Sequence, residues 1–185
     1  MKNRGVNFNS YFGSDVTEEM ISQAIDIDSC VYTGHLKGMY DTCVGWWKKN
    51  PEIYVMLEDK KTNKIVGYIN AMPINDDLYQ KIRNGESIDT AITPDDIETY
   101  NENKAYKLYF CSIAIHPDYH NTNAFKRLIN QFMLHIFELH ERGINFSSYI
   151  ADAVSAVGEK MCKYIGLKYV NDTKHKSKIF ELTNE

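Results

Sequence analysis

The chain lacks any long apolar run. None of its 185 residues belongs to a stretch that approaches the roughly 18 apolar residues needed to span a membrane. The N-terminus, MKNRGVNFNSYF, is polar and has no apolar core of the kind found in secretory signals. We therefore expect a protein without a membrane segment that resides in the cytoplasm.

Cysteine and histidine do not follow the spacing of a metal site. His116 and His120 are four apart but flank Pro117, so they cannot share a helix face. No Cys-x-x-Cys pair occurs, which argues against a zinc site and against the disulfide framework of a small secreted domain. We expect no metal requirement. The four cysteines are Cys30, Cys43, Cys111 and Cys162.

An excess of positive charge is also absent. Lysine plus arginine number 21 against 25 aspartates plus glutamates, for a net charge of −4, and no basic stripe indicates a nucleic-acid partner. Hydrophobic residues make up 43% and charged residues 25%, as in ordinary globular domains. The length favours one domain, 1–185.

The most informative segment is LYFCSIAIHPDYHNTNAFKRL, from Leu108 to Leu128. An apolar strand pattern meets a proline, a polar loop and then a helical pattern. A strand that leads into a helix N-terminus is a common phosphate site, because the first helical N–H groups are unpaired and the dipole is positive there. The loop has no glycine, so we expect Asn123 to take the positive φ that glycine usually supplies.

Hydrophobic periodicity predicts a mixed α/β (α+β) sheet with helices on its faces. Between 73 and 105, turn signals such as Asn84-Gly85 and Thr93-Pro94 replace apolar periodicity, and we expect an insertion with short helices near 77–83 and 94–100. This insertion is either a plain loop excursion or a lid that shapes a substrate site. Strands are expected at 6–12, 53–57, 65–72, 106–115, 146–150, 167–170 and 177–182, and longer helices at 20–27, 40–49, 123–141 and 154–164.

Two segments of the chain carry a resemblance. The first runs IHPDYHNTNAF from Ile115 to Phe125, and the second runs SAVGEKMCKYIGL from Ser155 to Leu167. In this order, with a helix and a strand between them, they resemble the two motifs of the GNAT family of acyl-CoA-dependent N-acyltransferases. The resemblance covers most of the chain. It implies a GNAT-like fold, with a central mixed sheet flanked by helices and the insertion before the cofactor-binding strand.

The chain departs from the family pattern at five positions. His120 stands where arginine or glutamine is usual, Asn123 where the first key glycine is usual, and Phe125 where a second small residue is usual. Ser155 replaces an asparagine that touches the cofactor in relatives, and Cys162 replaces a tyrosine that protonates the leaving thiolate.

The resemblance implies acetyl-CoA as the co-substrate, bound between the strand ending at Ile115 and the strand 146–150. Backbone groups of Ile113 and Ile115 would bond the pantetheine arm, and the loop would hold the pyrophosphate, with Lys126 and Arg127 adding charge. The cofactor-binding residues implied are Ile113, Ala114, Ile115, His120, Asn121, Thr122, Asn123, Ala124, Phe125, Lys126 and Ser155.

Candidate catalytic groups are few. Cys162 could donate a proton to the departing thiolate, or it could be a small core hydrophobe on an apolar helix face. The strand 106–115 contains no aspartate or glutamate to act as a base. Asp76, Asp77 and Glu102 in the insertion are possible substitutes, although each also fits a turn or surface position.

Two functions remain open at this point. The first is an N-acetyltransferase that moves an acetyl group from acetyl-CoA to the primary amine of a small molecule or peptide by direct attack. The second is a GNAT-like module that binds acyl-CoA or a partner protein without turnover. Assembly as a homodimer also stays open.

Overall fold

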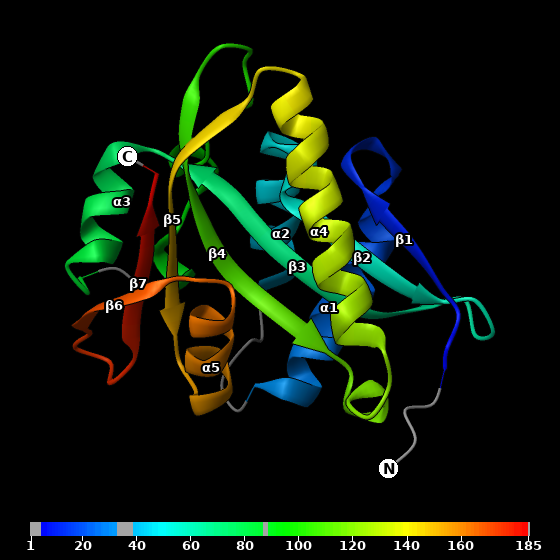
Figure 1. The fold of residues 1–185 in the computed structure, drawn as a ribbon. Coiled ribbons are helices and arrows are strands. Elements are labelled where there is room, and N and C mark those ends of the chain that lie inside the picture. The colour runs from blue at the N-terminus through cyan, green and yellow to red at the C-terminus, as the bar shows by residue number, and fades with distance from the viewer. Residues whose placement is uncertain (1–4, 33–38, 87–88, 185) are drawn as a thin grey trace. The chain divides into compact units, whose positions relative to one another are not determined.

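A computed structural model describes residues 5–32, 39–86 and 89–184 (Figure 1). The seven strands form one sheet in the order β1-β2-β3-β4-β5-β7-β6, and its mixed character confirms the predicted mixed α/β sheet. β4 and β5 run parallel, whereas β1–β2, β2–β3, β5–β7 and β6–β7 are antiparallel. The strands are β1 Phe8–Phe12, β2 Tyr54–Asp59, β3 Lys64–Ile74, β4 Ala105–Ile115, β5 Asn145–Ala153, β6 Lys168–Asp172 and β7 Lys178–Thr183, and the helices are α1 Glu18–Val31, α2 Met39–Lys49, α3 Asp76–Arg83, α4 Ala124–Glu141 and α5 Ala156–Tyr164.

The chain divides into two compact units. The first comprises Met1–Asn70 and Ser112–Glu141, and the second comprises Ala71–Cys111 and Arg142–Glu185. The division falls inside β3 and β4, so each of these strands contributes residues to both units. That the chain acts as a single domain stays a prediction.

In the first unit, helices cover both faces of the strands. α4 packs against β1 and β2, and α1 packs against α2. In Figure 1, α4 lies in front of β2, and α1 and α2 lie behind it. α1 begins where the Thr17 side chain accepts a hydrogen bond from the Met20 N–H, and Ile21, Ala24 and Ile27 form its buried face.

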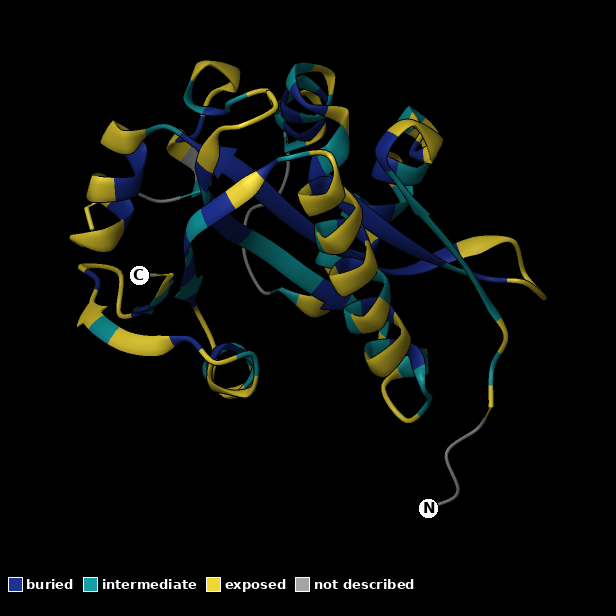
Figure 2. Ribbon diagram, turned by 45° about the horizontal axis from the view of Figure 1, so that its top comes forward, coloured by how far each residue is buried: buried dark blue, intermediate teal, exposed yellow. Residues whose placement is uncertain are grey.

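α4 buries one stripe and exposes the opposite one (Figure 2). Its buried side chains recur at helical spacing, at Leu128, Phe132, His135 and Leu139. His135 is satisfied inside this stripe, because its Nε2 lies 2.8 Å from the carbonyl oxygen of Glu52. The predicted helix 123–141 is therefore confirmed to within one residue.

In the second unit, β5 pairs with β7 and β7 with β6, and α5 packs against β5. The insertion belongs to this unit's core rather than to its edge. α3 is capped by Asn75, whose side chain accepts from the Leu78 N–H. The residues that the insertion buries are Leu78, Tyr79, Ile82, Ile92 and Ile97.

The helix expected near 94–100 does not form. Pro94–Asp96 makes a single 3-10 turn, closed by a capping box between Thr93 and Asp96. Ile97 then becomes extended and bridges to Ile74. The turn predicted at Thr93-Pro94 therefore forms, but the pairing of Ile97 with Ile74 prevents the turn from continuing as a helix.

Truncation of Ile82 tests whether the insertion is part of the core. Ile82 is 3% exposed, so Ile82→Ala should lower the free energy of unfolding by about 2–5 kcal/mol. The matched control is Gln80→Ala on the exposed side of α3, which should change stability by less than about 0.5 kcal/mol. Urea denaturation measures both, and equal effects would show that the insertion is only loosely attached.

Candidate functional site

The segment after β4 is a compact turn. Pro117–Tyr119 forms a 3-10 turn, and the Tyr119 N–H donates to the carbonyl oxygen of His116 at 2.9 Å. The His120 N–H donates to Pro117 at 3.1 Å, and the Thr122 N–H donates to Tyr119 at 3.1 Å. These amides are thus engaged inside the loop.

The prediction that Asn123 takes positive φ is wrong. Its side-chain Oδ1 instead accepts a hydrogen bond from the Val6 N–H, at 3.3 Å. This contact ties the loop to the chain just before β1. Among the described residues, the non-glycine residues with positive φ are Asn63, Asn103 and Lys176.

A threonine explains why the loop needs no glycine. The Thr122 hydroxyl donates to the carbonyl oxygen of Tyr119 at 2.7 Å and accepts from the Ala124 N–H at 3.1 Å. One side chain therefore closes the turn and satisfies the first amide of α4. The backbone at Asn123 therefore does not enter the left-handed region that would favour glycine.

The start of α4 carries positive charge. The helix is 18 residues long, and its first turn contains no acidic residue. Lys126 and Arg127 are both exposed in that turn. Cations there oppose the helix dipole, so the arrangement is stabilised when an anion lies at this end.

The end of β4 is held by side chains of the first unit. The Nε2 of His120 lies 2.8 Å from the carbonyl oxygen of Ile115. The hydroxyl of Tyr32 donates to the carbonyl oxygen of Ile113 at 3.4 Å. Ala114, between them, is buried. The first unit thus brings together all of the predicted cofactor residues except Ser155, and their roles stay predictions.

Ser155 belongs to the second unit, where it caps α5. Its hydroxyl accepts a hydrogen bond from the Gly158 N–H at 3.1 Å. This is the ordinary role of a serine at a helix start. A role in cofactor binding stays a prediction.

Cys162 is buried on α5, with 6% of its surface exposed. Burial, with smaller contributions from the nearby Asp152 and Glu159, raises the pKa of its thiol from 9.0 to about 11. A thiol with so high a pKa is a poor proton donor to a thiolate. The geometry therefore favours the interpretation of Cys162 as a core hydrophobe.

The acids of the insertion sit in structural positions. Asp76 opens α3 and pairs with Lys107, with Nζ and Oδ1 2.6 Å apart. Asp77 is exposed in the same first turn, and Glu102 is exposed in a turn before β4. All three acids therefore occupy turn or surface positions, which was the alternative to a role as the catalytic base.

A chain of hydroxyl groups on the first unit was missed by the sequence reasoning. The Tyr68 hydroxyl on β3 donates to the carboxylate of Asp28 on α1. The same hydroxyl lies 2.9 Å from the Oγ of Ser112 on β4. The hydroxyl of Tyr32 lies 3.3 Å from that Oγ and also reaches Ile113.

Asp28 is the ionisable end of this chain. Burial raises its pKa from 3.8 to about 6, and the hydrogen bond from Tyr68 opposes that rise. Burial and the nearby carboxylate hold the pKa of Tyr68 well above 10.0. The sequence did hold a signal, because Asp28 lies seven residues after Ile21 and four after Ala24, on the buried face of α1.

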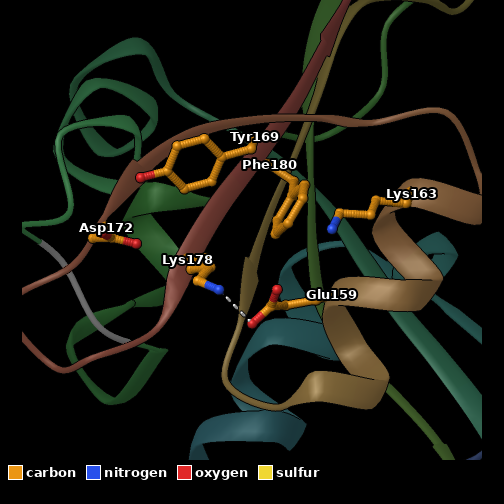
Figure 3. Close-up of a pocket in the computed structure, with 6 residues that line it drawn as sticks. All are labelled: Glu159, Lys163, Tyr169, Asp172, Lys178 and Phe180. Carbon is orange, nitrogen blue, oxygen red and sulfur yellow. Dashed lines mark hydrogen bonds and ion pairs between the residues drawn. The ribbon is translucent and has the colours of Figure 1, made fainter.

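A shallow open hollow of about 300 Å³ lies in the second unit. Figure 3 shows Lys178 reaching toward Glu159, and their Nζ and Oε1 atoms are 2.9 Å apart. This pairing neutralises one of the two lysines in the hollow, and no predicted site residue lines it. The lining residues are Glu159, Lys163, Tyr169, Asp172, Lys178 and Phe180.

The described part of the chain holds neither a membrane-spanning helix nor a cluster of metal-binding side chains. No helix there is both long and apolar enough to cross a membrane. Within the same residues, no cluster of three or more histidine, cysteine, aspartate or glutamate side chains could hold a metal ion.

Solved structures provide the comparison that decides the fold. The loading GNATL domain of CurA from Lyngbya majuscula matches with a TM-score of 0.66 and 13% identity, over 96% of this chain and 98% of that domain. The chain has the GNAT fold. No family model and no curated protein shows a significant match to the sequence.

Two further GNAT-fold neighbours show the same extent of similarity. A mosquito arylalkylamine N-acetyltransferase-like protein matches at a TM-score of 0.58 and 13% identity, over 96% of this chain and 100% of that one. The PaiA N-acetyltransferase from Thermoplasma acidophilum, solved in complex with coenzyme A, matches at 0.55 and 11% identity, over 96% and 99%. At such identities the similarity shows the fold alone.

The role of Thr122 leads to a stability prediction. Thr122→Val keeps the shape of the side chain but leaves the Ala124 amide without its acceptor and removes the hydroxyl bond to the Tyr119 carbonyl, which keeps its bond from the Thr122 N–H, so it should cost about 1–2 kcal/mol of unfolding free energy. Thr122→Ser keeps the hydroxyl and should stay within about 0.5 kcal/mol of wild type. Chemical denaturation of the three proteins measures this, and a fully stable valine variant would contradict the assigned role.

Proposed function

We propose that the protein is an N-acyltransferase that moves an acetyl group from acetyl-CoA to the primary amine of a small molecule or peptide. The observation that carries the proposal is the start of α4 in a chain with the GNAT fold. There a long helix follows β4 after a short loop, with Lys126 and Arg127 in an acid-free first turn. This charge pattern suits the phosphates of a CoA molecule.

The residues present fit an acyl-CoA ligand in part. The two exposed cations and the dipole of α4 suit the phosphates. The amides of Tyr119, His120 and Thr122 are already bonded within the loop, so they do not face a ligand in this conformation. We therefore assign more of the phosphate binding to the two side chains than in a glycine-rich loop.

The reaction needs a neutral amine beside a thioester carbon. The nitrogen attacks the carbonyl carbon, the nitrogen–carbon bond forms, the carbon–sulfur bond breaks and CoA leaves as a thiolate. Because the pKa of Cys162 is raised to about 11, we assign protonation of the thiolate to solvent rather than to this thiol.

Two of the compared structures guide the choice of acceptors. One neighbour is an arylalkylamine N-acetyltransferase-like protein, and another was solved in complex with coenzyme A. We therefore propose to test an arylalkylamine, with a simple aliphatic amine and a peptide with a free N-terminus as the other small-molecule and peptide acceptors. The assay incubates each with acetyl-CoA and follows both free thiol and the mass of the acetylated product.

The charge at the start of α4 gives a binding prediction. Replacing both Lys126 and Arg127 by alanine should raise the Kd for CoA about ten- to a hundredfold, because charge-assisted bonds to phosphate are lost. Calorimetric titration measures the change at fixed ionic strength. The matched control replaces Lys60 and Lys61, which are exposed in the turn between β2 and β3, and should leave Kd unchanged.

Three outcomes are informative. Weaker CoA binding in the α4 variant alone supports the assigned site. Equal affinity in all three proteins overturns the site. No binding of CoA, acetyl-CoA or longer acyl-CoAs by the wild type overturns the function itself.

A GNAT-fold module that binds acyl-CoA without turnover is the second candidate. The internally bonded loop favours it, because Thr122 holds the turn closed through two hydrogen bonds. The two functions separate cleanly in the same assay. A module binds CoA but yields no acetylated amine and no thiol with any acceptor.

A further inference from the structure

We propose that Asp28 is the final proton acceptor of the transfer reaction, and that Ser112 and Tyr68 pass the proton to it from the acceptor amine. This inference rests on the proposed acyltransferase function. It supplies the base that the strand Ala105–Ile115 lacks, since that strand contains no acidic residue.

The direction of the hydrogen bonds carries the argument. Tyr68 has one hydroxyl proton, and that proton is donated to Asp28. The Tyr68 oxygen, 2.9 Å from the Ser112 Oγ, is therefore the acceptor of the serine proton. The protons of Ser112 and Tyr68 thus both point toward the carboxylate of Asp28, which is the order that a proton relay requires.

The middle group of the proposed relay, Tyr68, is shielded from solvent. Tyr68 is 3% exposed, whereas Asp28 and Ser112 are half-buried. A buried hydroxyl thus connects two groups that are each partly open. Inside a protein, hydrogen bonds of this kind strengthen one another because little solvent screens them.

The open end of the relay lies next to a predicted cofactor residue. Ser112 directly precedes Ile113 in β4, and Tyr32 contacts both the Ser112 Oγ and the Ile113 carbonyl, at 3.3 and 3.4 Å. The backbone of Ile113 is where the pantetheine arm is expected. An amine beside the thioester would then lie within reach of the serine or of Tyr32.

The charge state of Asp28 suits a proton acceptor. The groups that face its carboxylate are the hydroxyl of Tyr68 from β3 and, beyond it, that of Ser112 from β4. Burial raises the pKa of Asp28 to about 6, and no charged side chain among the described residues contributes to that shift. At pH 7 the group is mostly ionised, and an amine that becomes positively charged on attack is acidic enough to lose its proton to it.

The proton balance closes without any further reactant. As the nitrogen–carbon bond forms, a nitrogen-bound proton goes to the Ser112 oxygen, the serine proton goes to Tyr68, and the tyrosine proton goes to Asp28. The carbon–sulfur bond then breaks, and the thiolate takes a proton from water. Asp28 returns its proton to solvent, so the net products are the amide and free CoA.

The second unit provides a matched control. There the hydroxyl of Tyr109, itself buried, donates to Asp89, whose pKa burial also raises to about 6. This tyrosine–aspartate pair is chemically equivalent to Tyr68–Asp28 but contains none of the predicted site residues. Asp89→Asn therefore controls for the loss of a buried carboxylate in general.

The activity test uses the full chain with acetyl-CoA and whichever amine of the panel it acetylates. Asp28→Asn should lower kcat by roughly 10²–10⁴ with an unchanged Kd for CoA. In the wild type, the pH profile of kcat should contain a rising step at about pH 6, separate from the rise at higher pH that comes from deprotonation of the amine, because the relay needs the ionised carboxylate. The asparagine variant should lose this step, while Asp89→Asn should keep it.

A second variant shows whether the groups act as one relay. Tyr68→Phe keeps the ring but breaks the chain, so it should lower kcat like Asp28→Asn, and the double variant should be no slower than either single one. Wild-type kcat with an unchanged pH profile in Asp28→Asn would overturn the relay and leave the acyltransferase intact. A wild type that binds CoA but acetylates no amine would overturn the acyltransferase, and the relay with it.

A stability measurement separates a lost proton acceptor from a damaged fold. The folded-state pKa of Asp28 is raised from 3.8 to about 6, so the ionised carboxylate costs stability as pH rises through about 6. Asp28→Asn removes this cost. The Tm of the variant relative to wild type should therefore increase between pH 4 and pH 8, by a few degrees, and a difference that stays constant or falls over this range would contradict the assigned environment of Asp28.

Discussion

The hydroxyl of Tyr68 is the contact on which the first unit's site depends. It donates to Asp28 of α1 and lies 2.9 Å from Ser112 of β4, while its own residue belongs to β3. One buried side chain thus joins three elements of the unit. A buried tyrosine without these partners would leave an unsatisfied hydroxyl, which is costly, so the three elements are held in a fixed arrangement. The same arrangement places an ionisable group at the end of β4.

The glycine-free loop shows how a familiar turn is built from different residues. The Thr122 hydroxyl does locally what a left-handed glycine does through the backbone, and the Asn123 side chain anchors the loop to Val6. A loop closed in this way keeps fewer amides available for an anion. The two cations in the first turn of α4 compensate for that loss if the ligand is a CoA, which ties the unusual loop to the charge pattern that follows it.

Much of the fold could be predicted from the sequence, because hydrophobic periodicity and helix capping depend on residues that are close together along the chain. The buried stripe of α4 follows from helical spacing, and the mixed sheet follows from the succession of strands and helices along the chain, whereas the order of the strands in the sheet was not predicted. The prediction of a short helix near 94–100 was wrong because Ile97 pairs with Ile74. A local sequence pattern carries no information about such pairing between distant residues. The prediction of a positive φ at Asn123 was wrong for a similar reason, since the role of Thr122 depends on the geometry of the whole turn.

The site was harder to predict than the fold. Asp28, Tyr68 and Ser112 come from three elements separated by at least 40 residues, and no motif links them. The motif directed attention to Cys162, because relatives carry a tyrosine at that position. Burial raises the pKa of the Cys162 thiol, so it is a poor proton donor. A site assembled through tertiary hydrogen bonds becomes visible only when the strands and the helix are placed together.

The most direct test of the account is a crystal structure of the protein with bound CoA. The account predicts that the phosphates lie at the first turn of α4, in contact with Lys126 and Arg127, and that the thiol lies beside Ile113 and Ser112. CoA bound elsewhere, for example in the hollow beside Lys163 and Tyr169, or phosphates that avoid α4, would contradict it.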